Sequence, residues 1–117
     1  LIMAETYVDL LTVGITTSTA IAAGQPVTST GGAATAAGSC LGIAKTAIAS
    51  GAYGPVQVAG VALCVAGGAI TAGDYVKVGS TVTQVVTQGG TGTIIGVALN
   101  ATSNAGDAVR VLLKTAN

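Results

Sequence analysis

The feature that most constrains the fold is a repeated order of glycine turns and short runs of Val, Ile and Thr. A Gly or Gly-Gly interrupts these runs about every eight to twelve residues, which is the spacing of turns in all-β domains. Helix-forming residues gather only at 33–37, and glycines bracket that stretch so closely that a loop is favoured. The sequence therefore predicts an all-β fold.

About eight short strands are expected. They lie at residues 6–13, 26–29, 40–44, 56–65, 75–78, 82–86, 93–99 and 108–113. Alternation is clearest at 75–78 and 108–111, where Lys77 and Arg110 point away from the flanking valines and leave one wet and one dry face. Residues 56–72 are the most apolar stretch, but they are short for a membrane span, contain three glycines and have no Lys or Arg close by. We interpret them as two buried strands and a turn.

The chain repeats this order of elements in two halves. Three motifs recur: the turn at Gly24 returns at Gly73, 49 positions later; Leu-Gly-Ile-Ala at 41–44 returns as Ile-Gly-Val-Ala at 95–98, 54 positions later; and Val56 in Pro-Val-Gln-Val returns as Val109 in Ala-Val-Arg-Val, 53 positions later. Neither half can bury its own dry face alone, so the two are expected to close on each other as a small barrel or sandwich.

The domain organisation follows from this repeat. We expect a single β domain at residues 14–117, with pseudo-repeats at about 14–65 and 66–114. Residues 1–13 precede the first repeat as an N-terminal arm or a first strand. Residues 1–11 contain two acids and no basic residue, so a signal peptide is not expected.

Glycine and aspartate are expected to build the turns ahead of the strands. Gly24, Gly73 and Gly106 can adopt positive φ, and the side chains of Asp74 and Asp107 can hold the turns that follow two of these glycines. A paired-carboxylate site would have to use the same two aspartates, which the repeat relates to each other, but turn formation is the favoured role.

Two further glycines fall inside expected strands. Gly42 and Gly96 occupy the same place in the repeated Leu/Ile-Gly-x-Ala motif. A strand glycine marks either a β-bulge or the close approach of another backbone. We expect one of these at both positions.

The sequence lacks the side chains that most enzymes use. There is no histidine, which removes the commonest general base, the commonest metal ligand and every Ser-His or Cys-His nucleophile. The Gly-Gly-Thr-Gly run at 89–92 has no following Lys, so it is interpreted as a hairpin turn and not as a phosphate loop. We predict a protein that is not an enzyme and has no cofactor and no metal.

The two cysteines do not form a metal-binding motif. Cys40 and Cys64 are 24 positions apart with no Cys-x-x-Cys, and both are expected in strands as small apolar residues. A disulfide between them and two free buried thiols are both compatible with the sequence, and the lack of a secretion signal favours free thiols.

Charge is scarce and scattered along the chain. Four basic residues balance four acidic ones, and only 7% of residues are charged. Binding to nucleic acid or to an anionic membrane needs clustered Lys and Arg, so neither partner is expected. A surface of small neutral residues loses little when it is covered, which favours a life in a protein assembly. The alternative is an ordinary Ala/Gly-rich soluble domain.

Specific motifs connect the chain to a known family. Ile-Gly-Val-Ala-Leu at 95–99, followed by Ala-Gly-Asp-Ala-Val-Arg-Val at 105–111, with Ala-Gly-x-x-Val at 23–27, resembles the small capsid decoration or cement proteins of tailed phages. The resemblance covers nearly the whole chain from Met3. It implies a protein made in the host cytoplasm that docks on the outside of an assembled shell, bridges coat subunits and resists the pressure of packaged DNA. Its partners would be the major capsid protein and other copies of itself, as a dimer or trimer.

The segment expected to bind the coat is residues 6–13, because it has no evident counterpart ahead of the second half. In this interpretation Tyr7, Val8, Leu10 and Leu11 belong to an arm that adds a strand to a coat-protein sheet. The equally weighted alternative is a strand of the chain's own barrel. A second function that the composition permits is a self-assembling fibre, tube or surface-layer subunit.

Overall fold

The computed structural model describes residues 8–81 and 83–113, the first three by their backbone only, and confirms the all-β fold class. The eight strands are β1 (Val8–Thr16), β2 (Pro26–Val27), β3 (Gly42–Ala44), β4 (Tyr53–Val65), β5 (Tyr75–Val78), β6 (Val85–Thr87), β7 (Gly96–Ala98) and β8 (Ala108–Leu113). Each expected strand has a counterpart in this set. The bounds of 75–78 and 108–113 agree to the residue, and the other strands differ by two or more residues at one end or both.

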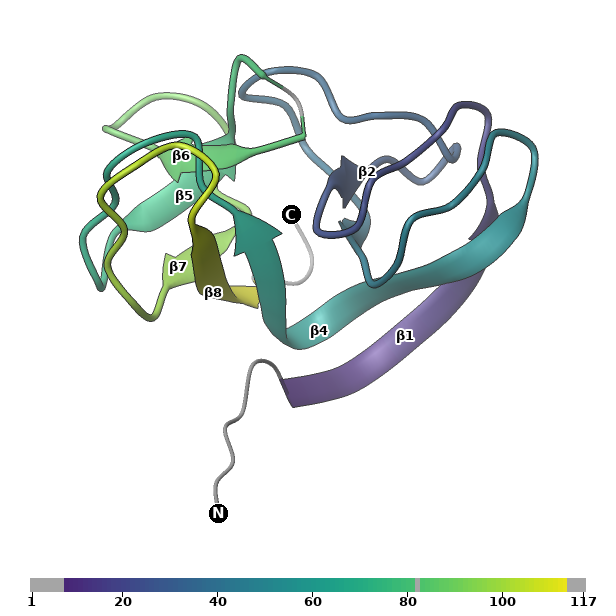
Figure 1. The fold of residues 1–117 in the computed structure, drawn as a ribbon, viewed down its shortest axis with the longest axis horizontal. Coiled ribbons are helices and arrows are strands. Elements are labelled where there is room, and N and C mark those ends of the chain that lie inside the picture. The colour runs from purple at the N-terminus through teal and green to yellow at the C-terminus, as the bar shows by residue number, and fades with distance from the viewer. Residues whose placement is uncertain (1–7, 82, 114–117) are drawn as a thin grey trace.

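The strands form one antiparallel sheet that curls on itself. Its order is β2-β3-β4-β8-β7-β5-β6, and β1 pairs with β4 outside this path. Figure 1 shows β5 to β8 gathered in one lobe, β2 in the other, and the long strand β4 running through both. A parallel bridge between Ala66 and Val85 brings β6 back beside the end of β4, so the second lobe is nearly closed.

Of the two strands and a turn expected at residues 56–72, strand β4 supplies the first. It runs unbroken to Val65, and only then does the chain turn and form an isolated bridge at Ile70. Gly60, with φ of 101°, lets it bend between the lobes. The buried Gln57 amide holds this bend, because its Nε2 donates to the carbonyl oxygens of Ala59 and Val61 at 3.1 Å each.

The two halves have the same strand pairing, with one difference from the expected alignment. Strands β2, β3 and β4 pair in the order of β5, β7 and β8. Val56 pairs with Ala44, and Val111 pairs with Ala98 at the matching place in the second half. The counterpart of Val56 is therefore Val111, 55 positions later, and the alignment with Val109 was wrong. A slip of two residues keeps every side chain on its face, so sequence similarity could not detect it.

The same pairing gives β1 a counterpart that the sequence did not reveal. Val13 of β1 pairs with Val56, whereas Ala62 of β4 pairs with Val111. The C-terminal part of β4 is therefore the counterpart, in the second half, of β1 in the first half. The expectation that residues 6–13 have no counterpart was wrong, and their described part, from Val8, lies in the chain's own sheet.

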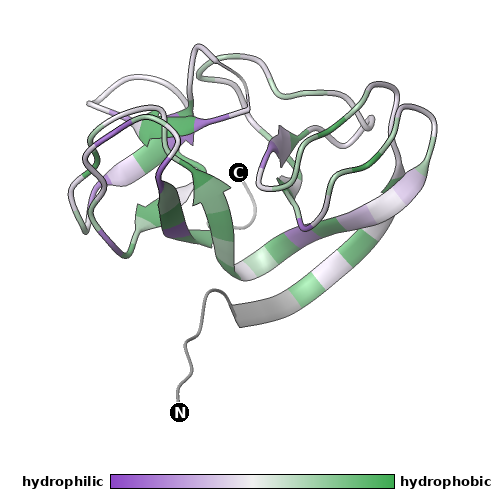
Figure 2. Ribbon diagram, viewed as in Figure 1, coloured by the Kyte–Doolittle hydropathy of each residue, from purple (hydrophilic) through white to green (hydrophobic). Residues whose placement is uncertain are grey.

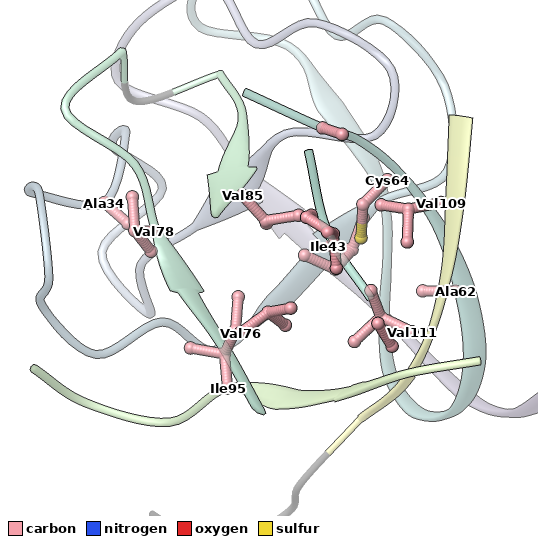
Figure 3. Close-up of a cluster of buried hydrophobic side chains, with 13 residues drawn as sticks. Ala34, Ile43, Ala62, Cys64, Val76, Val78, Val85, Ile95, Val109 and Val111 are labelled. Atoms are coloured by element: carbon pink, nitrogen blue, oxygen red, sulfur yellow. The ribbon is translucent and has the colours of Figure 1, made fainter. Parts of the chain in front are cut away.

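Two clusters of small aliphatic side chains form the core. The first half is filled by Ile21, Val27, Ala44, Ile48 and Val56. The larger second cluster lies inside the curled second lobe and contains Val76, Val85, Val109 and Val111 together with Ile43, which β3 contributes from the first half (Figure 3). Ala34 is a second first-half residue in this cluster, so Ile43 and Ala34 both tie the two halves together.

The strand glycines mark close backbone approaches, one of the two alternatives expected. A Cβ at Gly42 would collide with the carbonyl oxygen of Gln57 on β4. A Cβ at Gly96 would lie 2.5 Å from the carbonyl oxygen of Leu112 on β8. Both positions bring a neighbouring strand so near that no side chain fits between them.

Candidate functional site

The turn glycines and aspartates hold the ends of the strands. Gly24, Gly73 and Gly106 have φ of 80°, 94° and 94°. The Asp74 carboxylate accepts from the backbone N–H of Thr71 at 3.0 Å, and the Asp107 carboxylate accepts two backbone N–H groups of its own turn at 3.1 Å each. Each carboxylate therefore already accepts hydrogen bonds from the backbone of its own turn.

The described part of the chain has no metal-binding cluster. Over residues 8–81 and 83–113 there is no group of three or more His, Cys, Asp or Glu side chains that could hold a metal ion. Every buried side-chain nitrogen or oxygen of the described residues has a hydrogen-bond partner. The described residues also include no helix with the length and apolar character needed to span a membrane.

The two cysteines are free thiols in the second core cluster. Cys64 lies in β4 as expected, whereas Cys40 precedes β3 and belongs to a loop, contrary to expectation. Burial raises the pKa of Cys40 to about 11, and burial together with the nearby Cys40 raises the pKa of Cys64 further. Neither thiol is a ready nucleophile at neutral pH.

A partly open hollow of about 180 Å³ lies between the two halves, beside β4. Its lining is mainly aliphatic and includes Ile43, Ala62 and Leu63. Its polar side chains are Lys45 and Gln57, and the Gln57 amide already donates to the bend of β4. The hollow therefore offers few polar groups to recognise a small molecule.

The most prominent surface feature is an apolar area on the outer face of the second lobe. We call it the outer patch, and it consists of Val61, Leu63, Tyr75, Val97, Leu99 and Leu112. Four of these side chains are 38–57% exposed. In Figure 2 the strands of this lobe are the most strongly hydrophobic part of the molecule. Exposed apolar areas of this kind are typical of protein interaction sites.

The sequence did not predict the outer patch, because the face that carries it was expected to be polar and exposed to solvent. Lys77 and Arg110 do point away from the core, as the alternation predicted. The same alternation also places Tyr75 and Leu112 beside them on that face. These apolar residues at outward positions were the signal that could have found the patch.

The segment expected to bind the coat is described only in part. Tyr7 lies outside the described residues, as do the side chains of Val8 and Leu10. Leu11 is 53% exposed, and its backbone pairs with Ala59 of β4. Among the described residues β4 is the only strand that pairs with β1, so one edge of β1 has no strand beside it.

A known protein family matches this β-rich chain. The family model described as phage cement protein matches residues 7–113. The chain belongs to this family. The resemblance seen in the 95–99 and 105–111 motifs is thereby confirmed, and this cement-family chain is a phage structural protein and a component of the virion.

A solved structure shares the fold of this cement-family chain. It is the crystal structure of the head fiber gp8.5 N base in bacteriophage phi29, with a TM-score of 0.71 and 18% sequence identity over 89% of this chain and 95% of that one. At this identity the likeness shows a common fold. None of the curated proteins compared with the chain matches it.

Proposed function

We propose that the chain is a decoration protein that binds the outer surface of an assembled capsid and stabilises it by bridging neighbouring coat subunits. Its partner is the major capsid protein, and it performs no catalysis. The observation that carries this proposal is the cement-protein match over residues 7–113. The described structure agrees with the proposal, because it offers apolar surface for docking.

The neutral composition supports an outer position on the shell. Four basic and four acidic residues give a formal net charge of zero. A protein lying against packaged DNA would need clustered cations to neutralise phosphates. Weak contacts repeated over many symmetry-related copies are enough for tight attachment.

Bridging requires contact with two coat subunits, and we assign one contact to β1. The edge of β1 that no described strand pairs with can accept a coat strand through main-chain hydrogen bonds. In this proposal Tyr7, Val8, Leu10 and Leu11 lie at the contact. Deletion through Leu11 should abolish binding to shells and leave the β circular-dichroism signal in place. Loss of both would favour a strand of the chain's own barrel over a coat-binding arm.

Shells assembled without the decoration protein provide the direct test. Adding the purified chain should raise the temperature at which the shells break open, and electron microscopy should show added density on their outer surface at fixed positions between coat subunits. Shells of unchanged stability with no added density would refute the proposal.

A second candidate function is a self-assembling fibre or tube subunit. The edge of β1 that no described strand pairs with favours it, because an open strand edge can also pair with another copy of the same chain. Particle shape separates the two candidates. Filaments formed by the purified chain alone would support the fibre, whereas small soluble particles that bind only preformed shells would support decoration.

A further inference from the structure

The outer patch is built from rows of directly opposed side chains. Tyr75 pairs with Val97, Val97 with Leu112, and Leu112 with Val61. Directly paired residues project from the same face of a sheet with their Cβ atoms about 5 Å apart. The row is therefore one continuous apolar strip across β5, β7, β8 and β4.

A second row lies beside the first and contains a cation. Arg110 of β8 pairs with Leu63 of β4, and the N–H of Leu99 donates to the Arg110 carbonyl oxygen at 2.8 Å. The half-buried Arg110 side chain thus stands between two leucines. Among the described residues no carboxylate forms an ion pair or hydrogen bond with its guanidinium.

The matching row in the first half shows what this face does in the fold. There Pro26 pairs with Ile43, and Ile43 pairs with Gln57, in the positions of Tyr75, Val97 and Leu112. All three first-half residues are fully buried, and Ile43 packs into the core of the second lobe. The same face is therefore covered by the chain itself in one half and left open in the other.

We infer that the outer patch is a second docking surface, and that its occupant is a coat-protein surface in which apolar side chains surround a carboxylate that pairs with Arg110. This inference rests on the proposed function. A tyrosine and an arginine within an apolar area are the residue types that dominate binding energy at protein interfaces. A carboxylate reaching Arg110 would remove the cost of covering an unpaired charge.

The charges argue against a second copy of the chain as the occupant. A two-fold pairing of outer patches would bring Arg110 toward Arg110 of the copy. A head-to-tail contact would need a carboxylate from this chain. Of its four acidic residues, the two whose side chains are described, Asp74 and Asp107, already accept bonds in their own turns. A surface of another protein can supply the carboxylate that Arg110 needs.

The test measures binding of the full chain to shells assembled without it. Tyr75→Ser and Leu112→Ser should each weaken binding about tenfold or more, as truncation of a central interface residue does. Arg110→Gln should weaken binding to a similar degree, and Arg110→Lys should do so less. Thr46→Glu, at an exposed site off the patch, changes the net charge by the same one unit as Arg110→Gln and should leave binding within about twofold. Circular dichroism establishes that each variant is folded.

The outcomes separate this inference from the proposed function. If the natural chain binds and the patch variants bind equally well, the outer patch is not a docking surface and the decoration role stands. If the natural chain binds no shell, both ideas are overturned. If the free chain forms oligomers in sedimentation experiments that Leu112→Ser dissociates, the occupant is a second copy and the coat assignment is wrong.

Discussion

Replacing Gly96 by alanine tests the close approach of β7 and β8. The new Cβ would lie 2.5 Å from the Leu112 carbonyl oxygen and 2.5 Å from a methyl of Val111. A comfortable carbon–oxygen contact is about 3.3 Å, so the two strands would have to separate by roughly 0.8 Å. Overpacking of this kind costs about 1–3 kcal/mol, and the lower chain entropy of alanine returns about 0.5–1 kcal/mol. We expect a net loss of about 1–2 kcal/mol in the free energy of unfolding.

Urea denaturation followed by circular dichroism measures this loss, and Gly68 supplies the matched control. An added Cβ at Gly68 would meet no atom within 4 Å, and its φ is not positive. Gly68→Ala should therefore leave stability unchanged or raise it by about 0.4–1 kcal/mol. Gly42→Ala, at the matching position of the first half, should behave like Gly96→Ala. If Gly96→Ala proves as stable as Gly68→Ala, the reasoning about strand contact is refuted.

Three further predictions concern buried and turn-forming groups. Asp107→Ala should lower stability by about 1–2 kcal/mol in urea titration, because two backbone N–H groups lose their acceptor, and Asp107→Asn should recover part of this. Gln57→Leu should cost about 1–3 kcal/mol in the same assay, because it leaves two carbonyl oxygens at the bend of β4 without their donor. The pKa of Cys40 is raised from 9.0 to about 11, so the unfolded chain binds fewer protons than the folded chain between these values. Stability should fall by about 2–3 kcal/mol as the pH rises from 9 to 11, and Cys40→Ala should reduce the fall.

Sequence reasoning succeeded where local chemistry fixes the outcome. The strand bounds at 75–78 and 108–113 were predicted to the residue, because a basic side chain between valines leaves one assignment of faces. The close approach at Gly42 and Gly96 was one of the two roles expected from their shared motif. These features depend on period-two alternation and on the space around a strand, both of which are written in adjacent residues.

Where sequence reasoning failed, the information lay in the pairing between strands. Val56 and Val111 are equivalent because they pair with Ala44 and Ala98, the matching alanines of the two halves. A two-residue slip toward Val109 leaves the hydrophobic pattern unchanged, so the sequence does not reveal it. The outer patch could not be predicted from the sequence for a related reason. Ile43 and Val97 occupy equivalent places in the repeat, yet one is buried under the other half and one is partly exposed, and only the arrangement of the halves decides which.

The shared strand β4 leads to a prediction about cooperativity. It pairs with β1 and β3 of the first half and with β8 of the second, so neither half has a complete sheet without it. Unfolding of the first half would also withdraw Ile43 from the core of the second lobe and leave a cavity there. The chain should therefore unfold in one transition despite its repeat. Tyr53 in the first half and Tyr75 in the second serve as fluorescence probes when the other tyrosines are replaced by leucine. Coincident midpoints are expected, and two separate midpoints would show that the halves are independent units and that β4 does not join them.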